Sequence, residues 1–184
     1  MAFVAHAQTE HLKFSGIPIN GTLSQFQSKL VGKGYTEDKL LNNYSSGGSK
    51  FYKGNFIGNR VTLIVYYDQD TKNVYRVKAV IRGLTEDMAE NKLSDIKDKL
   101  QSKYEDCYYS DDEKDGRPSF SILPKRKLIA DEFETKWHNS YGEIDLFISK
   151  NEDLSDYPYH FNLHIDYNDQ INSDKHENKV MDDL

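Results

Sequence analysis

The chain has 184 residues, and its 24 Lys and Arg against 30 Asp and Glu give a formal net charge of −6 at pH 7. This acidic balance argues against a nucleic-acid partner, because phosphates require a basic face. The single cysteine, Cys107, excludes an intrachain disulfide and metal sites built on paired thiols, and no apolar run approaches the ~18 residues of a transmembrane helix.

The first residues, MAFVAHAQ, place a short apolar stretch and the pattern Ala5-His6-Ala7 before Gln8. A secretory signal peptide ends in small residues of this kind after an apolar segment. The pattern therefore predicts a periplasmic or secreted protein of a bacterium, with residues 1–8 as the remaining end of a signal peptide. The alternative is that these residues form an ordinary disordered terminus.

The sequence next predicts a strand, a helix and a three-stranded meander. Residues 11–19 alternate loosely between apolar and polar, and Pro18 favours an edge strand. Thr22 and Gln25 have the spacing of a capping box, so we expect a helix to begin there. Alternation and turn residues then predict strands at 51–57, 60–68 and 74–82.

The stretch HLKFSGIPINGTLSQFQSKLVGKGY, residues 11–35, resembles the beginning of exported proteins of unknown function from Bacteroides-type bacteria. Those proteins often start with a strand reading F-x-G-I-P-I-x-G-T, followed by a helix with F-x-x-K-L-x-x-K-G. The resemblance implies export. It implies no catalytic residue and covers only this stretch.

A second helix is expected to begin after Thr85, because Glu86 and Asp87 would stabilise its N-terminus. An acidic insertion near 105–125 follows, and within it residues 110–119 are expected to form an irregular, mobile excursion. The apolar stripe of the helix consists of Ala89, Leu93, Ile96, Leu100 and Tyr104.

Strands return roughly at 132–139, 142–149 and 158–167, and residues 171–184 form a polar tail with one short helix. The last strand has the clearest alternation of the chain. Its inward face is expected to hold Tyr159, Phe161, Leu163, Ile165 and Tyr167. Its polar face is expected to hold His160, Asn162, His164 and Asp166.

The same spacing separates Gly58 from Gly142 and Tyr75 from Tyr159, and the inward parity of the strands is kept. We therefore predict an α+β fold made of a tandem repeat, each unit a helix plus a three-stranded antiparallel sheet. The two sheets would join edge to edge, with both helices on one face. The alternative is a coincidence between two generic hairpins. The predicted repeats span residues 9–84 and 85–170.

This duplicated plan also resembles, at the level of the fold, the β-lactamase-inhibitor-protein-like repeats. The members of that group bind other proteins with an open sheet face, but a fold-level resemblance implies little about function.

His160 and His164 are candidate ligand-binding residues on the polar face of the last predicted strand. In an extended strand their Cα atoms would lie ~13 Å apart, too far for both to hold one metal ion. Asn162 between them is a poor ligand for the metals that histidine prefers. We therefore predict a solvated sheet face, with no metal ion and no cofactor.

Tyrosine is abundant, with 13 residues in the chain. Exposed Tyr is favoured at binding surfaces and can stack on sugars, which makes Tyr66, Tyr108, Tyr109 and Tyr157 candidate binding residues. The alternative is that tyrosines fill half-buried strand positions.

The sequence therefore favours an exported, non-catalytic binding or protein-interaction module whose partner is a protein or a glycan. A carbohydrate-contacting accessory protein and an unrecognised periplasmic hydrolase are the alternatives. A pocket with convergent polar groups would favour an enzyme, whereas an open sheet face would favour a binding module.

Overall fold

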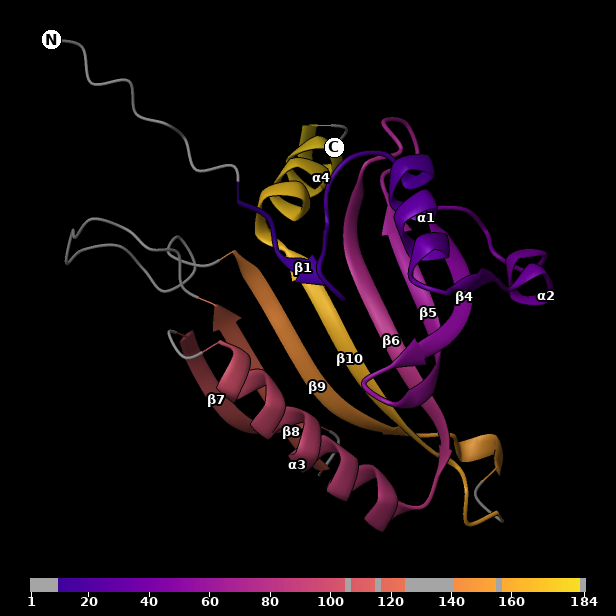
Figure 1. The fold of residues 1–184 in the computed structure, drawn as a ribbon, viewed down its shortest axis with the longest axis vertical. Helices are drawn as coiled ribbons and strands as arrows, with labels where there is room; N and C mark the ends of the chain where they lie inside the picture. The colour runs from indigo at the N-terminus through magenta and orange to yellow at the C-terminus, as the bar shows by residue number, and fades with distance from the viewer. Residues whose placement is uncertain (1–9, 105–106, 115–116, 125–140, 155–156, 183–184) are drawn as a thin grey trace, which may run out of the picture.

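An eight-stranded antiparallel sheet forms the body of the computed structural model, which describes residues 10–104, 107–114, 117–124, 141–154 and 157–182 (Figure 1). The strand order is β3-β4-β5-β6-β10-β9-β8-β7. Its strands are β3 (Thr36–Glu37), β4 (Ser49–Phe56), β5 (Asn59–Tyr67), β6 (Val74–Leu84), β7 (Cys107–Lys114), β8 (Arg117–Pro124), β9 (Gly142–Lys150) and β10 (Phe161–Asp169). The helices are α1 (Leu23–Gly32), α2 (Lys39–Asn42), α3 (Glu86–Lys103) and α4 (Gln170–Asp182), with a 3-10 turn at Glu152–Leu154.

Both long predicted helices begin where their caps indicate. The Thr22 hydroxyl accepts a hydrogen bond from the Gln25 N–H at 3.5 Å, and the Gln25 side chain accepts one from the Thr22 N–H at 3.0 Å. This pair is the capping box that the spacing predicts. The hydroxyl of Thr85 accepts a hydrogen bond from the Met88 N–H at 3.3 Å and begins α3 in the same way.

α1 and α3 pack on the same face of the sheet (Figure 1). The prediction of an α+β fold with helices packed against an antiparallel sheet is therefore confirmed. The buried residues that they contribute to one continuous core are Phe26 and Leu30 of α1 and Ala89, Leu93, Ile96 and Leu100 of α3.

The centre of the sheet is the antiparallel pair β6 and β10. Ala79 lies opposite Ile165, and Ile81 lies opposite Leu163. Alternate residues on both strands point into the core, as the sequence predicts. The buried residues of this face are Val77, Ala79, Ile81, Phe161, Leu163, Ile165 and Tyr167.

The prediction of one strand over residues 11–19 is wrong. The stretch forms a small separate hairpin, β1 (Lys13–Phe14) with β2 (Ile17–Pro18). The reason is a tight turn in its middle, where Ser15 and Gly16 have φ angles of 49° and 79°. Two successive residues with positive φ reverse the chain between short strands.

The prediction of an irregular excursion at 110–119 is also wrong. β7 and β8 form a hairpin that extends the sheet, with Asp111 opposite Phe120. Phe120 and Ile122 are buried in the core and anchor β8, while Lys97 of α3 forms an ion pair with Asp111. The predicted strand at 132–139 and residues 1–8 lie outside the described residues.

The prediction that Tyr159 and Tyr75 point into the core is wrong. Tyr159 precedes the start of β10 and is 59% exposed. Tyr75 is half-buried, because a register shift between Tyr66 and Tyr67 places Val74 in the core instead.

One buried carboxylate, Asp169, connects the first described residues to the start of α4. Its oxygens accept hydrogen bonds from the backbone N–H groups of Leu12 at 2.8 Å and Asn172 at 3.0 Å. The Nδ1 atom of His11 lies 3.0 Å from the same carboxylate. Asp169 is fully buried, so these contacts replace the water that it loses.

Candidate functional site

The sheet has a second face, opposite the one that α1 and α3 cover, which we call the open face. Its side chains alternate along each strand with the buried core residues. At its centre Arg76 and Lys78 of β6 meet Asp166 of β10. Arg76 Nε lies 2.8 Å from Asp166 Oδ1, and Lys78 Nζ lies 2.9 Å from Asp166 Oδ2. Asp166 is only 3% exposed, so its charge is balanced mainly by these two cations.

Neighbouring groups hold this ion network in place. The guanidinium of Arg76 lies 5.1 Å from the centre of the Tyr66 ring. Its hydrogen bond to Asp166 raises the pKa of Arg76 above the usual value. On the next strand Asp145 accepts a hydrogen bond from the Ser121 hydroxyl at 2.5 Å, and burial raises the pKa of Asp145.

His164 lies on this face, but the prediction of a solvated environment for it is wrong. Its ring stacks on Phe147 with centroids 4.5 Å apart and planes 5° from parallel. Burial, with a further contribution from Lys78, lowers its pKa to about 4. The imidazole is therefore neutral at pH 7.

Ser149 and His164 have half of the geometry of an activated nucleophile. Ser149 Oγ lies 2.7 Å from His164 Nε2. The other ring nitrogen, Nδ1, is buried and has no hydrogen-bond partner among the described residues. A catalytic pair of this type needs a third group that orients the base and a base whose pKa lies near the working pH. His164 lacks both within the described part of the chain.

Of the predicted binding residues whose side chains the structure describes, Tyr66 and His164 lie on the open face. Tyr157 and His160 lie before β10, where His160 Nδ1 contacts the Tyr157 carbonyl oxygen and Tyr157 is 65% exposed. Tyr108 and Tyr109 lie in β7, and their side chains fall outside the described part.

The residues that the sequence reasoning missed are Arg76, Lys78, Asp145 and Phe147. The alternation of β6 carried a usable signal, because Arg76 and Lys78 alternate with the buried Val77 and Ala79.

A hollow of about 250 Å³ opens beside the ion network, between β7, β8 and β9. Asp145, Ser119 and Ser121 present a carboxylate and two hydroxyls to it, and Lys114 lies over the Phe147 ring, 3.9 Å from its centre. The open face thus offers charged, hydroxyl and aromatic groups at fixed positions.

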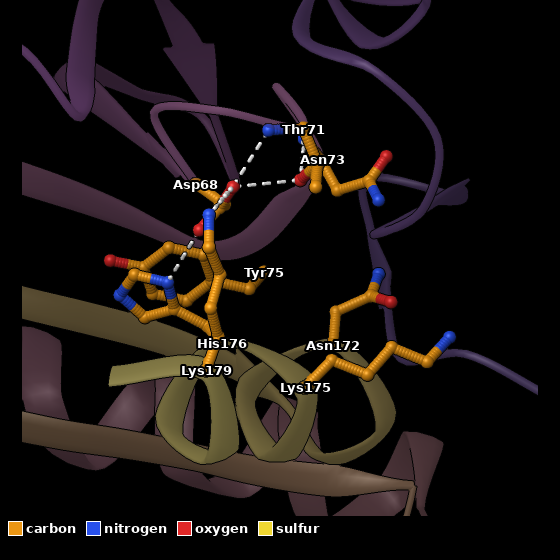
Figure 2. Close-up of a pocket in the computed structure, with 8 residues that line it drawn as sticks. All are labelled: Asp68, Thr71, Asn73, Tyr75, Asn172, Lys175, His176 and Lys179. Atoms are coloured by element: carbon orange, nitrogen blue, oxygen red, sulfur yellow. Dashed lines mark hydrogen bonds and ion pairs between the residues drawn. The ribbon is translucent and has the colours of Figure 1, made fainter. Parts of the chain in front are cut away.

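A second, smaller pocket of about 120 Å³ lies between α4 and the β5–β6 turn (Figure 2). Asp68 is at its centre and accepts hydrogen bonds from the Thr71 N–H at 2.8 Å and the Thr71 hydroxyl at 2.9 Å. His176 of α4 approaches Asp68 to 3.2 Å and stacks on Tyr75, with ring centroids 4.3 Å apart. The Thr71 backbone hydrogen bond, aided by the Thr71 hydroxyl and His176, holds the pKa of Asp68 well below its usual value.

This second pocket fits a structural anchor better than a catalytic centre. The Thr71 hydroxyl donates to the Asp68 carboxylate, and the lowered pKa of Asp68 makes that carboxylate a weak general base. The amide of Asn172 donates to the carbonyl oxygens of Ile19 and Val74, each at 2.9 Å. These contacts fasten α4 to the β5–β6 turn and to the segment after β2.

Within the described ranges, no group of three or more His, Cys, Asp or Glu side chains is arranged to hold a metal ion. None of the described helices combines the length and the apolar character needed to cross a membrane. Our comparisons with protein-family models, curated proteins and solved structures found no match to the chain.

Proposed function

We propose that the chain is an exported, non-catalytic binding module that contacts its partner through the open face. The observation that carries this proposal is the fixed array of Tyr66, Arg76, Lys78 and Asp166 at the centre of that face. A solvated sheet face needs only polar side chains. Long side chains that are already held in one geometry lose less conformational entropy when a partner binds.

A steric block tests the proposal. Thr62 lies on the open face of β5, opposite Val80, and Glu90 is an exposed residue of α3 on the other side of the sheet. Thr62→Trp should abolish the retention of exported proteins or envelope glycans from the source organism by the immobilised chain. Glu90→Trp should leave it intact. Retention that survives Thr62→Trp would show that the partner binds elsewhere.

A hydrolase is the second candidate, and only the contact between Ser149 and His164 favours it. The low pKa of His164 and the absence of an orienting group among the described residues weigh against it. A fluorophosphonate probe should therefore not label Ser149. Labelling that Ser149→Ala removes would establish a serine enzyme and overturn the non-catalytic proposal.

Export is proposed on the pattern Ala5-His6-Ala7 and the resemblance of residues 11–35 to exported proteins. Expression of the gene with its full upstream reading frame should give a mature chain that begins near Gln8. An uncleaved product in the cytoplasm would contradict export.

We further propose that the sheet consists of two related halves. β4, β5 and β6 follow α1, and β8, β9 and β10 follow α3, with the halves meeting through β6 and β10. Both helices cover the same face, as a duplicated unit requires. The β7–β8 hairpin contains the acidic stretch that separates the patterns of the two halves.

A further inference from the structure

The open face is divided electrostatically between its two halves. On β4, β5 and β6 its residues include cations and no carboxylate, whereas β7 and β9 contribute carboxylates together with the cation Lys114. The cations of the first half are Lys53, Arg60, Arg76, Lys78 and Arg82. We call the part of the open face that these residues form on β4, β5 and β6 the basic half. Because the whole chain has a net charge of −6, this local excess is opposite in sign to the charge of the molecule.

Two of these five cations form ion pairs within the described part of the chain, and three do not. Arg76 and Lys78 are neutralised by Asp166. Lys53, Arg60 and Arg82 are exposed and have no ion pair among the described residues. They are therefore free to meet an external anion.

The pairing of the strands places these three cations near one another. Lys53 lies opposite Thr62, and Thr62 lies opposite Val80. Arg60 and Arg82 each lie two residues beyond that row, in the same direction and on the same face. Because neighbouring strands are ~4.8 Å apart, the three side chains form one cluster at one end of the basic half.

A shallow hollow of about 430 Å³ adjoins this cluster at the β4 edge of the sheet. Its lining includes Lys53, Asn55 and Arg60, together with Thr36 of β3. An acidic side chain that enters the hollow would meet two cations and two neutral polar groups.

Two aromatic rings of the open face, Tyr66 and Phe147, are already occupied. Arg76 lies over Tyr66, and Phe147 has His164 stacked on it and Lys78 and Lys114 near its centre. Sugar rings bind proteins by stacking on free aromatic faces, so these two occupied rings offer a glycan little. Instead, the half-buried apolar side chains of Phe51 and Ile64 lie between the cations and suit the mixed surface of a protein.

We propose that the partner of the open face is a protein with an acidic surface that docks on the basic half, with its carboxylates on Lys53, Arg60 and Arg82. This proposal rests on the proposed function of the open face and specifies the class of its partner. Such charge complementarity chiefly raises the association rate and sets specificity, and it weakens as salt is added.

The test uses a glutamate–tyrosine copolymer as an acidic polypeptide and polygalacturonate as an anionic glycan, with binding measured by biolayer interferometry at low and high salt. The unaltered chain should bind the copolymer at least about tenfold more tightly than the glycan at low salt, and lose most of that binding at high salt. The triple variant Lys53→Gln, Arg60→Gln, Arg82→Gln should bind the copolymer at least about tenfold more weakly.

The matched control removes the same charge from another surface. Lys29, Lys33 and Lys39 are exposed cations of α1, its C-cap and α2, and their triple change to Gln should alter binding less than about twofold. No binding of the copolymer, an equal loss in the control, or equal or tighter binding of polygalacturonate would each overturn the acidic-protein proposal. The proposed function fails separately, if retention of natural partners survives Thr62→Trp.

Discussion

Arg76 and Asp166 form a two-point ion pair across the central strands of the sheet, with Nε to Oδ1 at 2.8 Å and Nη2 to Oδ2 at 2.5 Å. Asp166 lies directly opposite Lys78 on the neighbouring strand, so the arginine reaches it diagonally. The pair therefore joins β6 to β10 through side chains as well as through the backbone ladder.

Removal of this carboxylate should destabilise the fold. Asp166→Asn leaves Arg76 and Lys78 side by side without a counter-charge, and the loss of one partner from a buried pair typically costs about 3–5 kcal/mol. Because Arg76 is partly exposed, we expect a fall of about 2–3 kcal/mol in the free energy of unfolding, measured in urea. Asp95→Asn breaks the exposed pair with Lys99 and should change it by less than about 0.5 kcal/mol. Equal effects of the two substitutions would contradict the structural role of Asp166.

His164 should make stability depend on pH between about 4 and 7. Its pKa is lowered to about 4 in the fold, from 6.5, so the unfolded chain binds one more proton between these values. Stability is therefore complete near pH 7 and falls as the pH drops toward 4, by at most about 1.4 kcal/mol per unit. His164→Phe keeps a ring for the stack on Phe147 and should flatten this dependence. An NMR titration of the His164 ring with a midpoint near 6.5 would refute the explanation.

Asp68 should make the stability of the fold depend on pH in a more acidic range than His164 does. Its pKa is held below the ordinary value by the Thr71 N–H, so its contribution is present above about pH 4 and is lost as the pH falls below that value. Asp68→Asn should be less stable than the unaltered chain at pH 7, and this difference should shrink by pH 2 to 3. Asp70→Asn, on the exposed side of the same turn, serves as the control. A difference that stays constant from pH 7 to pH 2 would rule out the linkage.

Gly142 should not tolerate a side chain. Its φ of 155° is unfavourable for other residues, and a Cβ atom there would lie 2.1 Å from the carbonyl oxygen of Asn168. Gly142→Ala should therefore cost at least about 2 kcal/mol of unfolding free energy. Gly32→Ala in α1 meets open space and should be neutral or stabilising by up to about 1 kcal/mol. Chemical denaturation would measure the free energy of unfolding of both variants. A Gly142→Ala chain as stable as the unaltered chain would show that β9 starts differently.

The elements with strong local signals could be predicted from the sequence. Helices begin after Thr22 and Thr85, as their capping patterns predict. Val77 and Leu163 are buried in the core, as the alternation of β6 and β10 predicts. The acidic stretch of β7 could not be recognised as a strand, because its pairing depends on Phe120 and Ile122 of β8 and on the helix beside it. Such stabilisation comes from tertiary contacts, not from local propensity.

The candidate site was harder to predict for the same reason. Tyr66 of β5 and His164 of β10 share the open face only because both strands pair with β6, which no local pattern states. The stack of His164 on Phe147 likewise depends on the register of β9. Residue types and alternation therefore indicated which side chains face outward, but not which of them meet.

The carboxylate of Asp169 sets an order on folding. His11 and Leu12 find their partner 158 and 157 residues further along the chain. During N-terminus-first synthesis or translocation the leading segment must therefore wait until nearly the whole chain has emerged before it can dock. Contacts of such long range form late and slowly. Cleavage after Ala7 would leave both residues attached. A cut beyond Leu12 would instead leave the buried Asp169 carboxylate without these two partners.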